Sequence, residues 1–170
     1  MCTLLNHCDR VRMASLAQLV NVIAPIFTLP GGGVIRQTIF WPFKMMSQYA
    51  HGAVLNQFGT VPQIDTCYGG ANIVQSTMVY NAAKKEIAFF ALNMEEKLSV
   101  EVSFDLRDFG VTVLLKHITL HGNNLMARNS LESPEEVVPH IVHLSPEQVA
   151  RNKVSLPPLS FNMVIFSIIS

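Results

Sequence analysis

Charge is scarce in this sequence. Only 14% of the 170 residues are Asp, Glu, Lys or Arg, and twelve basic residues balance twelve acidic ones, so the formal net charge is zero. Proteins that bind nucleic acids or anionic membranes usually carry a basic patch or stripe, and a neutral chain offers no such electrostatic footprint. We therefore expect neither nucleic acid nor a membrane as a partner.

Cysteine is also sparse, and an export signal is missing from the first residues. Cys2, Cys8 and Cys67 are an odd number of cysteines at unmatched spacings, which favours free thiols in a reducing compartment. Polar residues between Asn6 and Arg10 occupy the place where a signal peptide would have its apolar run. These features predict a cytoplasmic protein.

One long segment, residues 13–35, has no charge. It is long enough for a bilayer span of about 20 residues, but Gln18, Asn21, Pro25 and Gly31–Gly33 would leave polar groups and broken backbone in lipid. Its first part, Val11–Asn21, is apolar on both faces, which is typical of a buried strand in a parallel α/β layer. We predict a strand followed by a loop.

Helical spacing appears on both sides of this strand. Cys2, Leu5 and Cys8 predict the last turns of a helix that ends near Asp9. A second helix is predicted to follow the break at residues 30–33 and to end at Gly52, and Pro42 is expected either to kink it or to restart it in the first turn of a new segment. Its apolar face would contain Ile39, Phe40, Phe43, Met46 and Tyr49.

From Ala53 onward the hydrophobic period changes to two. The segment Leu98–Asp105 alternates apolar and polar residues throughout, as in a strand with one buried face. The other predicted strands are Val54–Phe58, Ile73–Tyr80, Glu86–Asn93, Val111–Leu120, Val137–Leu144 and Phe161–Ile169, and residues 140–158 read as loops around a short strand. Short strands at this spacing predict an antiparallel sandwich, with the apolar segment Phe161–Ile169 as an interior strand.

The opening part of the chain carries a specific signature. Asp9–Val11, Leu16–Ile26 and Arg36–Phe43, in this order and spacing, resemble the last barrel strand and helix of the α-L-arabinofuranosidases of glycoside hydrolase family 51. The resemblance departs from the family at Ile35 and Phe161, where a larger aromatic residue is expected. It continues weakly through Val61–Thr66, Phe90–Asn93, Leu106–Gly110, His117–Gly122, Val137–Pro139 and Leu156–Asn162.

This resemblance implies a mainly β fold. Residues 1–52 would be the last β/α unit of an incomplete (β/α)8 barrel, and residues 53–170 a jelly-roll-like antiparallel β-sandwich. It also implies a retaining, exo-acting hydrolase of terminal arabinofuranosyl groups in arabinan- or arabinoxylan-type saccharides. The implied partners are those saccharides, the rest of the catalytic barrel and a second copy of the chain, with no cofactor.

Retaining glycosidases need two carboxylates about 5–5.5 Å apart. The resemblance places both on barrel strands upstream of the matching region, so we expect no catalytic residue on this chain and no activity from it alone. The acids that are present read as solvated surface groups, because a catalytic carboxylate needs burial or a partner to set its pKa. They include Glu95, Glu96, Glu101, Asp105, Glu135 and Glu136, while Asp9 reads as a helix-end charge and Asp65 as a turn residue.

Gln18 is the substrate-binding residue that the resemblance implies, because it matches a position at the carboxyl end of the last barrel strand. A neutral amide can donate to and accept from a sugar hydroxyl. Without the resemblance, a buried glutamine bonded to backbone is the better interpretation. Asn21 is a weaker candidate, with a loop cap as its alternative.

The remaining motifs predict structure more than chemistry. His117/His121 and His140/His143 have metal-like spacings, but strand geometry separates each pair, so no metal site is expected. The glycine-rich residues 30–33 lack the Lys-Ser/Thr of a phosphate-binding loop. The aromatic residues that could stack on sugars, Trp41, Tyr49, Tyr68 and Tyr80, are assigned to core packing.

A non-catalytic carbohydrate-binding or docking sandwich is the alternative function. A module that stands alone should have lost the apolar helix and the barrel strand, and this sequence keeps both. That observation favours the tail of a longer enzyme.

Overall fold

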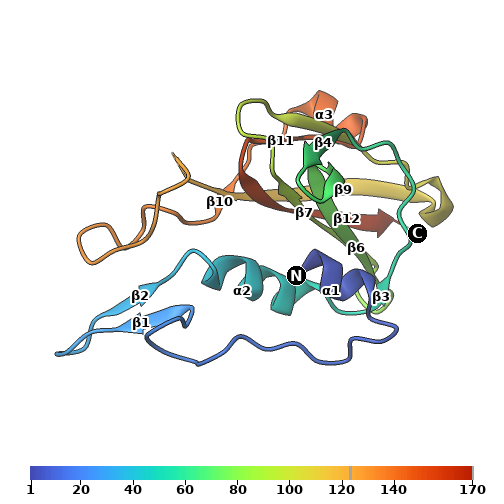
Figure 1. Ribbon diagram of the computed structural model, residues 1–170. Coiled ribbons are helices and arrows are strands. Elements are labelled where there is room, and N and C mark those ends of the chain that lie inside the picture. The colour runs from blue at the N-terminus through green and yellow to red at the C-terminus, as the bar shows by residue number, and fades with distance from the viewer. Residues whose placement is uncertain (123, 170) are drawn as a thin grey trace.

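The computed structural model describes residues 1–122 and 124–169, and its centre is one antiparallel sheet of six strands (Figure 1). The strand order is β10-β9-β12-β7-β6-β3. Their bounds are Ala53–Val54 for β3, Val74–Asn81 for β6, Glu86–Asn93 for β7, Val111–His121 for β9, His140–Ile141 for β10 and Ser160–Ile169 for β12. The predicted antiparallel, mainly β architecture is confirmed.

The interior position of the last strand is also confirmed. β12 pairs with β9 along one edge and with β7 along the other. Val164 and Phe166 point to one face of the sheet, whereas Met163 and Ile165 point to the other, and all four side chains are buried. Because both faces are covered, this strand is apolar on successive residues instead of alternating.

A smaller layer covers one face of the sheet. It contains β8 (Val100–Ser103) paired with β11 (Lys153–Leu156), together with the 3-10 helix η1 (Arg107–Phe109) and α3 (Pro146–Ala150). The side chain of Asn93 joins the two layers by donating to the carbonyls of Leu156 at 3.1 Å and Pro157 at 2.8 Å. The core between the layers is formed by Ile73, Val74, Met78, Ile87, Phe89, Ala91, Leu106, Leu114, Val154, Leu156, Val164 and Phe166.

Two helices cover the opposite face (Figure 1). α1 (Cys2–Asn6) buries Cys2, and α2 (Phe40–Tyr49) buries Met45 and Met46 against the sheet. Pro42 lies in the first turn of α2, which agrees with the restart alternative and not with a kink. All three cysteines are free, as predicted, and burial raises the pKa of the Cys2 thiol.

Gly52 lies between α2 and β3 with a φ of 130°, which disfavours any residue with a side chain. A Cβ atom at this position would collide with the backbone carbonyl of Tyr80 on β6. The division of the chain into domains at this glycine stays a prediction, because both helices before it pack against the sheet that follows it.

The predicted barrel strand is wrong. Residues 11–19 form no regular secondary structure, and Val20 makes only an isolated bridge to Ile26. The exposed fractions of Met13, Leu19 and Val22 are 88%, 75% and 77%. A parallel strand needs hydrogen-bonding neighbours at its edges and cover on both faces, and no strand in the described ranges runs alongside this segment. The barrel unit therefore does not form here.

The segment leads instead into a short hairpin. β1 (Ile26–Thr28) pairs with β2 (Val34–Arg36), and the turn contains Gly31 and Gly32, which both have positive φ angles.

None of the helices in residues 1–122 and 124–169 is long and apolar enough to cross a bilayer.

Two further strand predictions differ from the structure, and one hairpin was not predicted. The expected strands Val54–Phe58 and Val137–Leu144 shrink to β3 and β10, in the latter case partly because Pro139 has no N–H to donate to a ladder. The hairpin of β4 (Gln63–Thr66) and β5 (Gly69–Asn72) was not predicted, because its residues are mostly exposed and show no apolar alternation.

Candidate functional site

Gln18 lies in the irregular segment before β1. Its side chain is exposed, and its φ of 60° falls in the left-handed region that residues other than glycine seldom adopt. The barrel strand that would hold this amide at its carboxyl end is not formed. The alternative, a buried glutamine hydrogen-bonded to backbone, does not apply either, because Gln18 is exposed. A role in substrate binding stays a prediction.

Asn21, the weaker candidate, closes a loop. Its Oδ1 accepts from the backbone N–H of Thr28 at 2.8 Å, and its Nδ2 donates to the hydroxyl of Thr28 at 2.9 Å. The backbone N–H of Asn21 also donates to the carbonyl of Ile26 at 2.8 Å. These bonds match the loop-cap alternative.

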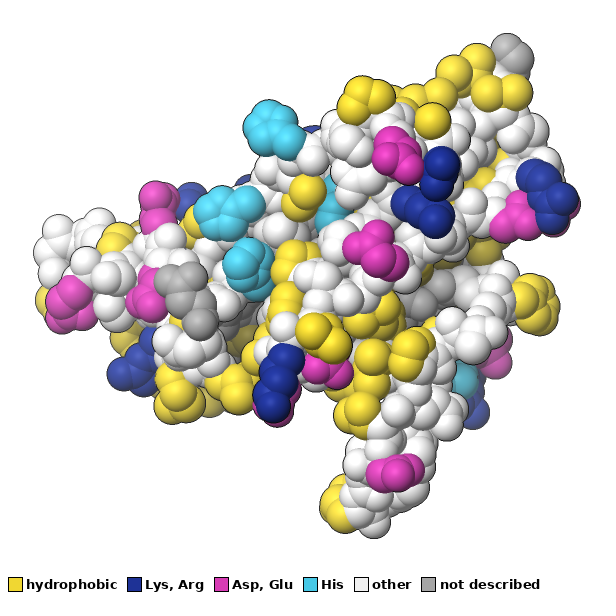
Figure 2. Space-filling view, turned by 90° about the horizontal axis from the view of Figure 1, so that it is seen from above, with side chains coloured by type: hydrophobic (Ala, Val, Ile, Leu, Met, Phe, Trp, Pro, Cys, Tyr) yellow, Lys and Arg dark blue, Asp and Glu magenta, His cyan; other side chains and the backbone are white. Residues whose placement is uncertain are grey.

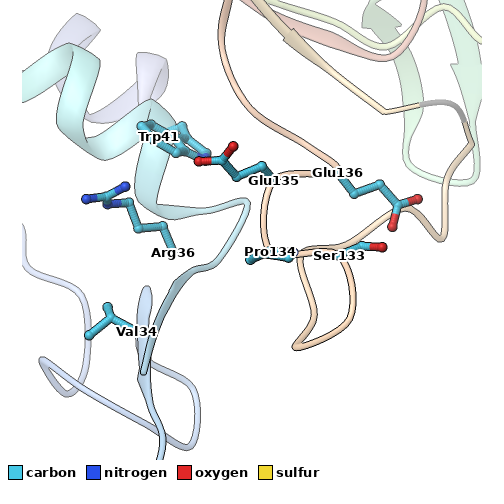
Figure 3. Close-up of a pocket in the computed structure, with 7 residues that line it drawn as sticks. All are labelled: Val34, Arg36, Trp41, Ser133, Pro134, Glu135 and Glu136. Carbon is cyan, nitrogen blue, oxygen red and sulfur yellow. The ribbon is translucent and has the colours of Figure 1, made fainter. Parts of the chain in front are cut away.

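A cleft forms where three segments meet: the hairpin β1–β2, the beginning of α2 and the loop of residues 124–139. Its volume is about 570 Å³. Figure 3 shows Arg36 and Trp41 on one side and the loop on the other, with the Glu135 carboxylate directed toward Trp41 and the Glu136 carboxylate directed away from it. The lining residues are Val34, Arg36, Trp41, Ser133, Pro134, Glu135 and Glu136.

A buried asparagine fixes the two walls of this cleft relative to each other. Asn129, only 4% exposed, donates through Nδ2 to the carbonyls of Arg36 at 2.7 Å and Val137 at 3.0 Å. Its Oδ1 accepts from the N–H of Val137 at 2.7 Å. The loop is tightened further by mutual bonds between Ser130 and Ser133.

The cationic side of the cleft is organised by aromatic rings. The Arg36 guanidinium lies 5.8 Å from the ring centre of Phe40 and 5.7 Å from that of Trp41, and the Lys44 ammonium lies 5.5 Å from Trp41. These separations are within the range of cation–π attraction. The indole nitrogen of Trp41 is buried and has no hydrogen-bond partner.

The acidic side of the cleft is unpaired. Glu135 and Glu136 are exposed, as predicted for surface acids. Ion pairs in the described ranges join Asp105 to Arg107 and Glu147 to Arg151, and neither pair includes Arg36 or a glutamate of the cleft. Arg36 and the two glutamates therefore lie around one cavity without forming an ion pair.

The other acids predicted to lie at the surface are exposed, except Glu95, which is half-buried. Glu101 on β8 and Asp105 are exposed, and hydrogen bonds from Arg107 lower the pKa of the Asp105 carboxyl. Asp65 belongs to the exposed strand β4 and is not in the turn where it was predicted. Glu95 accepts the backbone N–H of Lys97 at 3.1 Å, within a turn that follows β7.

The histidines divide into one buried residue and several exposed ones. His117 is fully buried on β9, where its Nε2 donates to Oδ1 of Asn162 at 3.0 Å and its Nδ1 has no partner. His121 and His140 are exposed on adjacent strands, and Figure 2 shows histidine side chains gathered on one face. Across residues 1–122 and 124–169, no group of three or more potential ligands is placed to hold a metal ion.

The aromatic candidates have mixed outcomes. Trp41, Tyr49 and Tyr80 pack against the two cores as predicted. Tyr68 is 98% exposed at the tip of the hairpin β4–β5, so its assignment to the core was wrong. The cleft was not predicted from the sequence, because Arg36 on one wall and Asn129 in the opposite loop are 93 residues apart in the chain.

Sequence comparison gives a consistent family. The model of the family described as "Alpha-L-arabinofuranosidase C-terminal domain" matches residues 1–160. An intracellular exo-α-(1→5)-L-arabinofuranosidase of Streptomyces lividans is 41% identical over 162 residues, which are 95% of this chain and 24% of that protein. The intracellular exo-α-(1→5)-L-arabinofuranosidase 1 of Bacillus subtilis is 36% identical over 166 residues, which are 95% of this chain and 32% of that enzyme.

Structural comparison agrees. A family 51 α-L-arabinofuranosidase from Bifidobacterium longum superimposes with a TM-score of 0.88 at 33% identity, covering 98% of this chain and 32% of that one. The chain thus spans about a quarter to a third of the length of these relatives. It belongs to the family of α-L-arabinofuranosidase C-terminal domains, the β-rich part of the glycoside hydrolase family 51 enzymes.

Proposed function

We propose that this chain acts as the C-terminal portion of a retaining, exo-acting α-L-arabinofuranosidase that releases terminal arabinofuranosyl groups from arabinan- or arabinoxylan-type saccharides. The observation that carries the proposal is the match to the family over residues 1–160. The relatives named intracellular support a cytoplasmic site of action. Self-association of the assembled enzyme is part of the proposal.

The catalytic carboxylates would come from outside this chain. A retaining mechanism needs a nucleophile and an acid/base about 5–5.5 Å apart, with at least one of them tuned by burial or a neighbouring charge. The acids discussed above are exposed or half-buried, and the two that pair with an arginine, Asp105 and Glu147, are both exposed. The pairing with Arg107 lowers the pKa of Asp105. We therefore expect no hydrolysis by the isolated chain.

Two surfaces of this chain would be covered by the rest of the enzyme. The first is the segment before β1, in which the large hydrophobic side chains of Met13, Leu19 and Val22 are exposed. The second is an open groove of about 1570 Å³ beside β8, lined in part by Val61, Val102 and Phe104. Among the described strands β8 pairs only with β11, so its other edge is free to accept a further strand.

Gln18 would contact the sugar once its strand is held in a complete barrel, since barrel enzymes place active-site residues at the carboxyl ends of their strands. Replacing Gln18 with Ala in the polypeptide that carries this sequence should lower kcat/KM on an arabinofuranoside about tenfold, the effect of one lost hydrogen bond of about 1.4 kcal/mol. Gln63→Ala, on the exposed strand β4, is the matched control. Equal rates for the two variants would remove Gln18 from the site.

The first test is the intact mass of the native polypeptide, isolated with an antibody against the sandwich. The proposal expects a mass well above the 18.9 kDa of this chain. A native mass near that value would contradict it and leave the second candidate, a non-catalytic carbohydrate-binding module. The cleft with Trp41 is the observation that favours the second candidate, and binding of arabinan without hydrolysis would support it.

A further inference from the structure

We propose that the cleft between β2, α2 and the loop of residues 124–139 is a saccharide subsite that holds a neutral arabinosyl unit through its hydroxyl groups. The choice of arabinosyl units rests on the function proposed above. The cleft volume of about 570 Å³ lies within the range of about 300–1,000 Å³ for small-molecule sites.

The charges of the cleft favour a neutral ligand. Arg36 lies on one wall and Glu135 and Glu136 on the other, and none of them has an ionic partner among the described residues. A cation bound to Glu135 would lie on the side of the cleft that faces Arg36, and an anion bound to Arg36 would lie on the side that faces the Glu135 carboxylate. A polyhydroxylated neutral ligand avoids both repulsions and offers donors to the acids and acceptors to the guanidinium.

The cleft is also held in shape before any ligand arrives. Asn129 bonds both to the carbonyl of Arg36, directly under one wall, and to Val137, next to the glutamates of the other wall. The Arg36 guanidinium is further positioned over the rings of Phe40 and Trp41. Such prior ordering reduces the entropy lost on binding, which is a major cost for flexible sites.

Trp41 gives this site a reporter group. Its indole nitrogen is buried without a partner, although a buried donor left unsatisfied costs about 1–3 kcal/mol. Trp41 lines the cavity, and Figure 3 shows Glu135 facing it. Because the ring lines the cavity, the indole N–H resonance would report a ligand bound there.

The experiment uses the fact that the chain has a single tryptophan. In a ¹⁵N-labelled sample, the indole N–H resonance is followed while α-(1→5)-linked arabinotriose is added. We expect a saturable shift of this resonance. In the double variant Glu135→Gln/Glu136→Gln the apparent Kd should rise at least tenfold, whereas Glu96→Gln, an exposed acid outside the cleft, should leave the Kd unchanged.

Two results would overturn the subsite. One is an unmoved indole resonance at millimolar arabinotriose in a sample whose amide dispersion shows the folded sheet. The other is a shift of equal size and midpoint in the double variant. If the 170-residue chain aggregates, the titration is done in the longer polypeptide, where Trp41→Phe identifies the resonance.

The readout needs no hydrolysis. Failure of the proposed function, seen as a native mass near that of this chain, can therefore be told apart from failure of the subsite. Inorganic phosphate and spermidine serve as charged probes in the same assay. A saturable response to either of them in place of the saccharide would contradict the neutral ligand.

Discussion

At the scale of single residues, the buried pair of His117 and Asn162 is the most consequential polar contact of the sandwich. Both side chains are fully buried, and Asn162 also donates to the hydroxyl of Ser160 at 2.7 Å. Burial lowers the pKa of His117, and the hydrogen bond to Asn162 only partly opposes this effect. The imidazole is therefore neutral in the folded protein near pH 7.

This histidine should make stability depend on pH. Below the ordinary value of 6.5 the unfolded chain binds a proton that the folded chain excludes until its lower pKa is reached. The contribution of neutral His117 to the free energy of unfolding should thus be fully present above about pH 6.5. Below this pH the free energy of unfolding should fall by up to about 1.4 kcal/mol per pH unit. Urea midpoints between pH 7.5 and 5.5 measure the slope.

His117→Gln is the informative variant, because glutamine can keep a bond to Asn162 but does not titrate. Its slope should be shallower, while His121→Gln, on the exposed end of the same strand, should match the unaltered protein. If His117→Gln retains the full slope, other groups cause the pH dependence.

The candidate site shows what residue patterns can and cannot reveal. The sequence analysis considered Trp41, Glu135 and Glu136 separately. The packing of Trp41 against the core and the exposure of the two glutamates were predicted correctly. Their arrangement around one cavity depends on Asn129 bonding to the carbonyl of Arg36, a backbone atom that has no residue-type signature. Gln18 was found only through family resemblance, and its setting requires a strand that is not formed here.

At the scale of elements, interior strands were predictable and peripheral ones were not. β7 has the predicted bounds Glu86–Asn93, and β9 and β12 differ from their predictions by one residue. Their patterns are strong because neighbours on both edges and cover on both faces select apolar residues. Val11–Asn21 has the same composition but lacks those neighbours, so its pattern predicted a strand that the described chain does not form.

The interior strand β12 should be the element most sensitive to truncated side chains. Phe166 is fully buried, and its ring centre lies 4.8 Å from that of Phe104 in the opposite layer. Phe166→Ala should reduce the free energy of unfolding by about 3–5 kcal/mol through lost burial and a residual cavity. Ile169→Ala, at the exposed end of the same strand, should cost less than about 1 kcal/mol. Denaturant unfolding compares them, and equal costs would contradict the assignment of β12 as the core strand.

At the scale of the whole molecule, both faces of the central sheet are covered, whereas apolar residues of the segment before β1 remain exposed. The helices and the β8–β11 layer bury both faces, as the two core clusters show. On the face in Figure 2, acidic and basic side chains are interspersed with hydrophobic ones. The exposed apolar residues before β1 are concentrated between residues 13 and 23, and such a concentration is typical of a contact surface.

The isolated chain should therefore self-associate through this segment. Leu19→Ser combined with Val22→Ser should shift the sedimentation profile toward monomer, because it removes two exposed hydrophobic side chains. Leu125→Ser, an equally exposed leucine of another loop, should have a smaller effect. A chain that sediments as a monomer at high concentration, or a double variant that behaves like the control, would contradict this expectation.

The central place of β12 also sets the order of events during synthesis. β12 emerges from the ribosome after both of its partners, β7 and β9, and it pairs with β7 residues that were made more than sixty positions earlier. Until then, each of these strands has an open edge, the kind of surface through which nascent chains pair wrongly. Folding that waits for such distant contacts is slow. The same strand that gives the finished sheet its core makes the growing chain a natural client for chaperones.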